Sequence, residues 1–247
     1  MRLRDAFYCR AECLETALID VLRVRPAPPR EPAARRIPLG LLLLSRQQLT
    51  EEQLRWALAA QKEADGCVDE ALPPQRKKIG LWLQELGFAT ELQVTAALAR
   101  QWSCPLLRAG LMAPGSRRFP AIPARLLASF QMMPVELAAT TRTLLMAFSE
   151  GIDYAALNAI EQMLGYRTDP CLVAPSTLRE ALQALARERT AGEINFDRVR
   201  DSDECAHIVA NYASTVKADE VRVARCGDYF WVRLERLRRE AVTMVFS

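Results

Sequence analysis

The hydrophobic and polar positions of this chain change period along its length, and each change predicts a different kind of structure. Apolar residues recur at helical spacing over 5–22 and again within two windows, 38–61 and 78–101. Beyond residue 123 the pattern predicts a small ββαβα unit, and beyond residue 203 a C-terminal α-β-β-β module. We therefore expect an α+β fold, in which an N-terminal helical repeat pair precedes these two mixed units.

The elements of the two mixed units can be assigned from the same pattern. In the first unit we expect strands at 131–137, 142–148 and 167–173, and helices at 123–130, 153–164 and 176–187. In the second unit we expect a helix at 203–216 and strands at 220–225, 228–235 and 241–246. Gly227 lies in the turn between the expected strands 220–225 and 228–235, where a positive φ would close a hairpin.

The two helical windows are copies of one another at an offset of forty residues. Aligned without a gap, PLGLLLLSRQQLTEEQLRWALAAQ and KIGLWLQELGFATELQVTAALARQ share ten identities. Chance would give roughly one or two, so the windows form an internal repeat, which usually means one supersecondary unit used twice. The shared positions are Gly40/Gly80, Leu41/Leu81, Leu43/Leu83, Thr50/Thr90, Glu51/Glu91, Gln53/Gln93, Ala57/Ala97, Leu58/Leu98, Ala59/Ala99 and Gln61/Gln101.

Each copy is expected to fold as a short helix followed by a longer one. Thr50 and Gln53 form a capping box before the longer helix, and the second copy repeats this box forty residues later. Gly87 can end the short helix of the second copy in the left-handed conformation. The first copy has Gln47 at that position, which is less suited to it.

Composition divides the chain into four parts. Residues 1–36 hold an N-terminal amphipathic helix, which can pack on the body or on a partner, and a Pro/Arg-rich linker. Residues 37–187 hold the repeats and then an α/β part at 123–187, with a polar loop between the repeats. Residues 188–202 form a second polar linker, and residues 203–247 form the α-β-β-β module.

Charge and hydropathy restrict the partners and the location. The net charge of +3 predicts no large electrostatic field, so a nucleic-acid partner is not expected. Only four basic residues are lysines, which fits the base composition of the genome as well as any nucleic-acid role. The longest leucine run, 41–44, is far shorter than the about 20 apolar residues that a membrane span needs. The charged N-terminus lacks the apolar core of a secretion signal. We expect a cytoplasmic protein that contacts the inner membrane peripherally, through a partner.

The sequence contains few candidates for catalysis or metal binding. Cys9 and Cys13 share a helix face, but without a second cysteine pair and with one histidine in the chain they do not favour a zinc site. No glycine motif forms a P-loop. His207 can either pair with a nucleophile or be an ordinary histidine at a helix edge. We therefore expect no enzyme and no metal, and no certain cofactor.

Beyond these motifs, the repeats resemble the signature RLGxxLLxxGxLTxxxLxxxLxxQ of the MshEN-type domain, the N-terminal domain of type II secretion and type IV pilus assembly ATPases (the GspE/PulE N-terminal family). The resemblance covers about 37–187, because a Pro-Val strand, a D-x-x-A-L-x-x-I-E helix and a G-x-R start of the last strand follow in the order of that domain. The tail DECAHIVANYASTVKADEVRVARCGDYFWVRLER is similar, less closely, to the segment before the ATPase motor. The resemblance implies the front part of an assembly ATPase that lacks its motor.

In that family the paired motifs form a cradle for cyclic di-GMP, and the resemblance implies the corresponding residues here. They are Leu39, Gly40, Leu54, Leu58 and Gln61 in the first copy, and Lys78, Ile79, Gly80, Leu98 and Gln101 in the second. The chain departs from the signature at the first-position arginine, which can stack on guanine or grip phosphate and which is Pro38 in one copy and Lys78 in the other. It also has Ser149-Glu150-Gly151 where the family tends to have Asp-Pro.

Three functions remain open at this point. The first is a non-catalytic regulatory or docking module, whose repeats serve as a helical scaffold and which binds a protein partner in a secretion, pilus or signalling assembly. The second is a cyclic di-GMP receptor that switches a partner through the paired motifs. The third is an unrecognised enzyme, for which His207 is the candidate residue.

Overall fold

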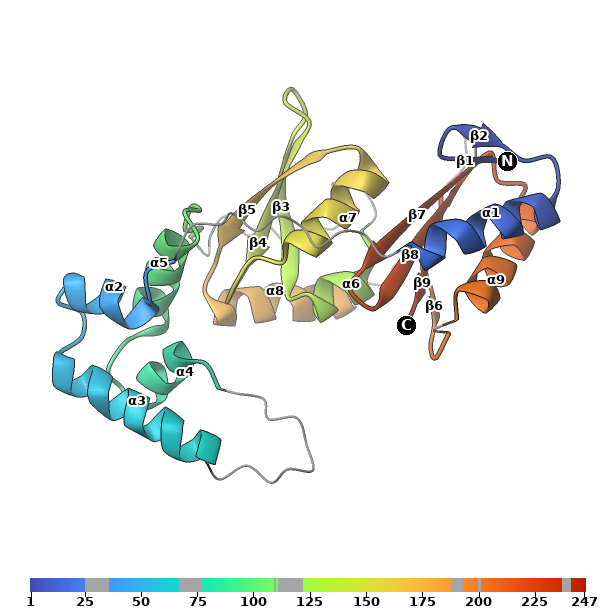
Figure 1. Ribbon diagram of the computed structural model, residues 1–247. Helices are drawn as coiled ribbons and strands as arrows, with labels where there is room; N and C mark the ends of the chain where they lie inside the picture. The colour runs from blue at the N-terminus through green and yellow to red at the C-terminus, as the bar shows by residue number, and fades with distance from the viewer. Residues whose placement is uncertain are drawn as a thin grey trace.

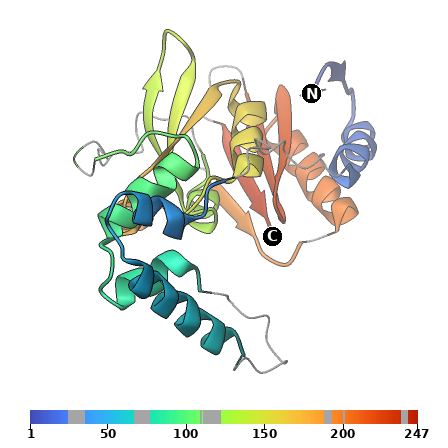
Figure 2. The same ribbon diagram turned by 60° about the vertical axis from the view of Figure 1, so that its left-hand side comes forward.

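The computed structural model describes residues 1–24, 36–66, 77–108, 110, 122–187, 193–199, 201–236 and 241–247. Within these residues the protein has an α+β fold with two separate sheets. The helical repeats lie at one end, the smaller sheet lies in the middle, and the larger sheet lies at the other end (Figures 1 and 2). Most of the loop expected between the repeats, and most of the connection that precedes residue 123, fall outside the described residues.

Each repeat folds as a short helix, a turn and a longer helix, as the sequence predicts. The four helices are α2 (Leu39–Ser45), α3 (Glu51–Gly66), α4 (Ile79–Glu85) and α5 (Glu91–Gln101). Both capping boxes form; in the first, Gln53 N donates to Thr50 Oγ1 at 3.2 Å and Thr50 N donates to Gln53 Oε1 at 2.9 Å. Gly87 takes φ +70° and Gln47 takes φ 56° at the equivalent place, a conformation that costs a residue with a Cβ about 1–2 kcal/mol.

The two repeats exchange packing partners. Helix α2 of the first copy packs on α5 of the second, while α4 packs on α3, and the short helices α2 and α4 also touch each other. Equivalent residues of the two copies fill the shared core and are fully buried: Leu43 and Leu83, Ala57 and Ala97. The pair therefore has an approximate twofold symmetry, and neither copy is a separate helical hairpin.

The middle unit is a three-stranded sheet with a helix on each face. Its elements are α6 (Ala124–Ser129), β3 (Met132–Ala138), β4 (Thr143–Phe148), α7 (Tyr154–Leu164), β5 (Arg167–Leu172) and α8 (Pro175–Arg187). β4 lies in the centre, antiparallel to β3 and parallel to β5, so α7 makes the crossover. β4 turns Leu144 and Met146 toward the core that contains α7, and Ala147 toward Leu178 of α8.

The larger sheet joins the two ends of the chain. Its strands are β1 (Arg2–Leu3), β2 (Ala6–Phe7), β6 (Glu193–Phe196), β7 (Glu220–Cys226), β8 (Tyr229–Glu235) and β9 (Val242–Phe246), in the order β2-β1-β7-β8-β9-β6. Helices α1 (Ala11–Arg23) and α9 (Ser202–Thr215) cover one face, where α1 buries Leu14, Leu18 and Leu22. The C-terminal sheet thus covers its face with an N-terminal helix.

The structure differs from the sequence pattern at both edges of this sheet. The helix expected over 5–22 begins only at Ala11, because β1 pairs with β7 and Arg2 N donates to Asp219 O at 2.7 Å. Strand β6 lies within 188–202, where a linker was expected, and pairs with β9. The division of the chain into four parts stays a prediction.

Helix α7 lies between the two sheets and links them (Figure 1). Its buried side chains belong to one apolar core with residues from one end of the larger sheet, Ala224, Cys226, Trp231 and Val245. The middle unit and the larger sheet are therefore packed directly on one another.

Candidate functional site

The terminal glutamines of the two repeats lie at the contact between the copies. Gln61 Nε2 donates to the backbone oxygen of Lys77 at 2.8 Å, and Gln101 Nε2 donates to the backbone oxygen of Ile37 at 2.7 Å. Because Ile37 and Lys77 are equivalent positions, each glutamine holds the start of the other copy. Both side-chain amides are thus engaged with the backbone of the protein itself.

Gly40 and Gly80 lie where a short helix contacts its neighbours. A Cβ on Gly40 would stand 2.7 Å from Leu54 Cδ1. A Cβ on Gly80 would stand 3.0 Å from Val94 Cγ1 and 3.2 Å from Leu39 Cδ2. These distances are shorter than ordinary van der Waals contact, so both glycines are required for close helix packing.

The other apolar residues predicted for the cradle have different environments. Leu39 is buried, and Leu54 and Ile79 are half-buried in the core of the repeat pair. Leu98 is half-buried where the repeat pair meets the middle unit, whereas the equivalent Leu58 is 48% exposed on α3. Of these five residues, Leu58 is the one that can contact another molecule without a change in packing.

Basic side chains lie at the starts of the two repeats, residues 36–38 and 77–78, which we call the repeat starts. Pro38 and Lys78 are the exposed N-caps of α2 and α4. Arg36 lies two residues before Pro38 and supplies the first repeat start with the cation that proline lacks. The glutamine hydrogen bonds and the contact of α2 with α4 bring the two repeat starts to one end of the pair.

Trp102 and the turn between β4 and α7 lie against the repeat starts. The Arg36 guanidinium lies 3.3 Å from the centroid of the Trp102 ring, a cation–π contact. A Cβ on Gly151 would stand 3.1 Å from Trp102 Cζ2, so the turn backbone also packs on this ring. Beside Gly151, Glu150 Oε2 accepts a hydrogen bond from Lys78 Nζ at 2.8 Å.

Sequence reasoning did not assign Arg36, Trp102 or Glu150 to the site. Two signals pointed toward them, since Trp102 directly follows the repeat and Glu150 lies in a turn that departs from the family pattern. Their proximity to the repeat starts was not predictable, because the Lys78–Glu150 contact joins positions 72 residues apart.

The outer faces of α3 and α5 differ, although the helices are equivalent. In α5, the Glu91 carboxylate accepts hydrogen bonds from Ser176 N at 2.8 Å and Ser176 Oγ at 2.6 Å, at the start of α8. Thr95, on the same face, is 1% exposed. The equivalent residues of α3, Glu51 and Arg55, form an exposed ion pair. The middle unit thus covers α5, and the corresponding face of α3 is exposed.

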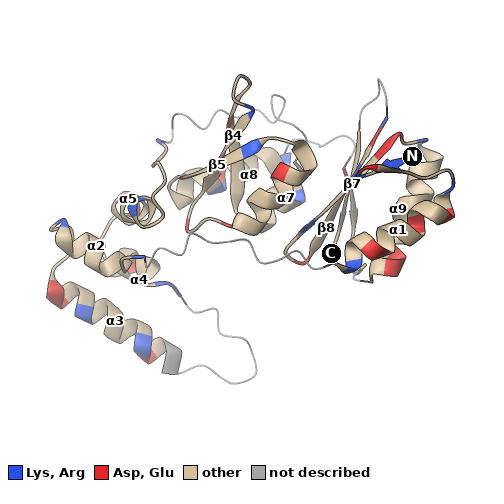
Figure 3. Cartoon of the chain, turned by 45° about the horizontal axis from the view of Figure 1, so that its top comes forward, with Lys and Arg blue, Asp and Glu red and all other residues tan. Residues whose placement is uncertain are grey.

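Two large apolar side chains flank this exposed face of α3. Trp56 is 68% exposed and Leu58 is 48% exposed. A tryptophan is large and apolar, so such exposure leaves a substantial area in contact with water. Figure 3 shows that the charges along α3 are of both signs, whereas acidic residues predominate on α1 and α9.

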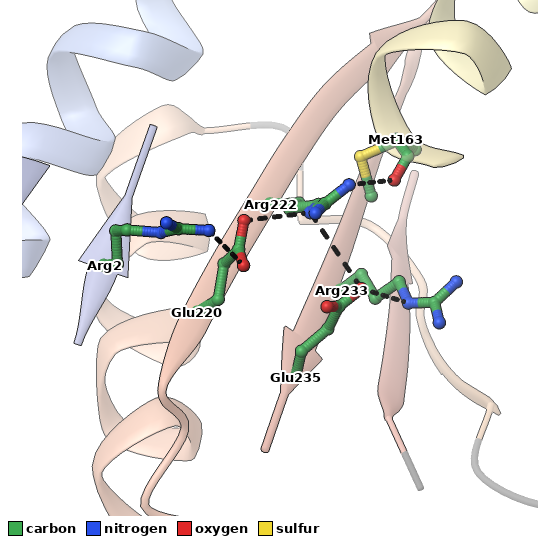
Figure 4. Close-up of polar contacts among 6 residues, drawn as sticks. All are labelled: Arg2, Met163, Glu220, Arg222, Arg233 and Glu235. Carbon is green, nitrogen blue, oxygen red and sulfur yellow. Dashed lines mark hydrogen bonds and ion pairs between the residues drawn. The ribbon is translucent and has the colours of Figure 1, made fainter. Parts of the chain in front are cut away.

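A chain of charged residues crosses the larger sheet (Figure 4). Arg222 occupies its centre: its Nε lies 3.1 Å from Glu220 Oε1 and its Nη1 donates to the Met163 backbone oxygen, at the end of α7, at 3.1 Å. Arg233 Nε lies 3.0 Å from Glu235 Oε1 without hydrogen-bond geometry, so that contact is purely electrostatic. The chain consists of Arg2, Glu220, Arg222, Glu235 and Arg233. Arg222 thereby connects the middle unit to the larger sheet.

The remaining candidates for chemistry have ordinary surroundings. His207 is exposed, and its Nδ1 lies 3.2 Å from Glu15 Oε1, in the contact between α9 and α1. Cys9 and Cys13 are exposed free thiols. Among the residues that the structure describes, no group of three or more His, Cys, Asp or Glu side chains could hold a metal ion. No described helix is long and apolar enough to cross a membrane.

The comparisons with known proteins concern the middle of the chain most directly. The model of the MshEN domain family matches residues 102–192. The solved structures that resemble the chain include a structure of MshE with cdg, at 25% identity and a TM-score of 0.48, over 60% of this chain and 98% of that one. They also include the N-terminal domain of XpsE, at 18% identity and a TM-score of 0.40, over 59% of this chain and 92% of that one. No curated protein sequence matches the chain. Residues 102–192 of the chain therefore match the MshEN domain family.

Proposed function

We propose that this chain is a non-catalytic docking module, related to the N-terminal part of secretion and pilus ATPases, that binds a protein partner through α3. The observation that carries the proposal is the difference between the two equivalent helices. α5 buries Thr95 against the middle unit, whereas the same face of α3 is exposed and is flanked by Trp56 and Leu58. Tryptophan and arginine are the residues most often found at the energetic centres of protein interfaces.

The chemistry of α3 indicates the kind of surface that would bind it. Trp56 and Leu58 are two residues apart and project from different sides of α3, so each requires its own apolar contact. The exposed Glu51–Arg55 pair requires a polar surface with charges of both signs. A component of a secretion, pilus or signalling assembly is the partner that the family suggests. The protein would then act in the cytoplasm and reach the inner membrane only through that partner.

Affinity capture of the full chain from its own cells tests this function. We expect the wild type to recover an assembly or signalling component, and Trp56→Ser to reduce that recovery at least about tenfold, as loss of a central tryptophan does. Phe7→Ser is the matched control, because Phe7 is an aromatic residue that is even more exposed, on β2, far from α3. Failure to recover any such component, or equal loss in both variants, would count against the proposal.

The geometry of the repeat starts favours a second function, binding of cyclic di-GMP. Arg36 lies at the first repeat start and Lys78, beside Lys77, at the second, and the repeats are related by an approximate twofold. A ligand with two equivalent halves and two phosphates would match such a pair, with guanidinium and ammonium groups as phosphate partners. The engaged amides of Gln61 and Gln101 would then shape the site through the backbone and not contact the ligand directly.

Isothermal titration calorimetry of the full chain with cyclic di-GMP tests this second function. We expect saturable heat that weakens in Lys78→Met, because the phosphate loses a cation. Lys217→Met is the matched control, since Lys217 is an exposed lysine that follows α9, in the unit at the other end of the molecule. The absence of heat at high micromolar ligand, from protein shown to be folded by circular dichroism, would show that the chain does not bind cyclic di-GMP.

A further inference from the structure

Glu150 lies against Lys78, a cation of the second repeat start. Its Oε2 is 2.8 Å from Lys78 Nζ, so the carboxylate of the β4–α7 turn already neutralises the cation of the second repeat start. The Lys78 and Glu150 side chains are 65% and 44% exposed, so the pair is open to solvent and to solutes.

The fold fixes the backbone that follows Glu150. Gly151 packs on Trp102 so closely that an added Cβ would be 3.1 Å from Cζ2. Two residues later, the Asp153 side chain accepts from Ala156 N at 2.9 Å and caps α7. The backbone on the C-terminal side of Glu150 is therefore fixed by tertiary packing and by a helix cap. The fold therefore holds the backbone that carries the carboxylate within reach of Lys78.

We propose that Glu150 is an internal competitor that occupies Lys78 until a phosphate of the ligand displaces it. This inference rests on the second function proposed above. An exposed ion pair of this kind contributes about 0.2–1 kcal/mol, so it can be exchanged for a stronger phosphate contact. Glu150 also repels an approaching phosphate through its own charge. The carboxylate therefore lowers the affinity of the repeat starts for every anion and favours ligands that also engage Arg36.

Calorimetric titration of full-length variants with cyclic di-GMP separates the contributions of the two charges. Glu150→Gln keeps the size and shape of the side chain and removes its charge, so we expect binding about threefold to tenfold tighter at low salt. In the Lys78→Met background, Glu150→Gln should increase the affinity for cyclic di-GMP much less, because the ammonium group with which Glu150 pairs is absent. The gain should also shrink at high salt, where exposed charges are screened.

Glu52→Gln is the matched control for this experiment. Glu52 is an exposed carboxylate in the first turn of α3, whereas Gln61, near the other end of that helix, contacts the second repeat start, so neutralising Glu52 should leave the affinity unchanged. Unchanged or weaker binding by folded Glu150→Gln, or an equal gain from Glu52→Gln, would overturn the competitor while leaving the ligand intact. Absence of binding by every variant would overturn the ligand and the competitor together.

Discussion

Gln61 and Gln101 show how a single side chain can hold one repeat against the other. In Gln61→Met the Lys77 carbonyl loses its donor, and we expect the free energy of unfolding to fall by about 1–2 kcal/mol. Gln101→Met should cost less, because its hydrogen bond to Ile37 is more exposed. Urea titration followed by circular dichroism measures both effects, with the exposed neighbour Lys62→Met as control. Equal unfolding midpoints for Gln61→Met and Lys62→Met would refute a structural role for the glutamine.

Three buried thiols give the protein a predictable weakness in alkali. Burial raises the pKa of Cys171, Cys205 and Cys226 from 9.0 to about 12. Below pH 9 both the folded and the unfolded chain keep these protons, so this contribution to stability is complete. Between pH 9 and pH 12 the unfolded chain loses them first, and stability falls by up to about 1.4 kcal/mol per pH unit for each thiol.

Urea midpoints measured from about pH 8 to about pH 10.5 test this prediction. We expect the slope of stability against pH above pH 9 to be smaller in Cys205→Ala than in the wild type, since one titrating thiol is gone. Cys13→Ala is the control, because Cys13 is exposed and its removal should leave the slope as it was. The same slope in all three proteins would show that other groups cause the alkaline loss.

Among helices and strands, those with local signals were predictable. The capping boxes of α3 and α5 and the alternation of β3 and β4 lie within short windows of sequence, and the structure confirms them. The strands β1 and β6 carry no such signal, since they have two and four residues. β1 forms only because β7, more than two hundred residues away, offers a partner for Arg2 and Leu3.

The different surroundings of α3 and α5 predict that substitutions at equivalent positions differ greatly in their effect on stability. Thr95→Arg puts a charge into the contact between α5 and the middle unit, and we expect a loss of about 3 kcal/mol or more. Arg55→Thr, the reverse change at the equivalent position of α3, should alter stability by no more than about 0.5 kcal/mol, because Arg55 is exposed. Thermal unfolding of the two variants decides the matter; similar melting temperatures would mean that α5 is not firmly docked.

For the complete chain, the sequence predicted the parts of the candidate site better than their assembly. The repeat and its ten positions were visible as a pattern, but the exchange of partners was not, because a repeat unit shows its own helices and not which copy they pack on. The link from Lys78 to Glu150 and the link from Arg222 to Met163 both cross between units of the fold. Such contacts depend on how the units pack, which no short window of sequence encodes.

Because α1, from the N-terminal part of the chain, packs on the larger sheet, we expect both ends of the chain to unfold together. Leu18 of α1 is fully buried in the core that α1 and α9 form on this sheet. Leu18→Ala should therefore cost about 2–5 kcal/mol. Hydrogen exchange should become faster in α9 and β7, while α2 and α4 exchange as before, since they belong to a separate core.

Asp20→Ala is the matched control, because Asp20 is an exposed residue of the same helix. Faster exchange confined to α1 in the Leu18 variant would mean that the N-terminal helix rests on the sheet without stabilising it. Faster exchange in α9 and β7 as well would mean that residues from both ends of the chain form a single cooperative unit. That unit contacts α7 through Arg222, and the middle unit to which α7 belongs contacts α5 of the repeats through Ser176 and Glu91.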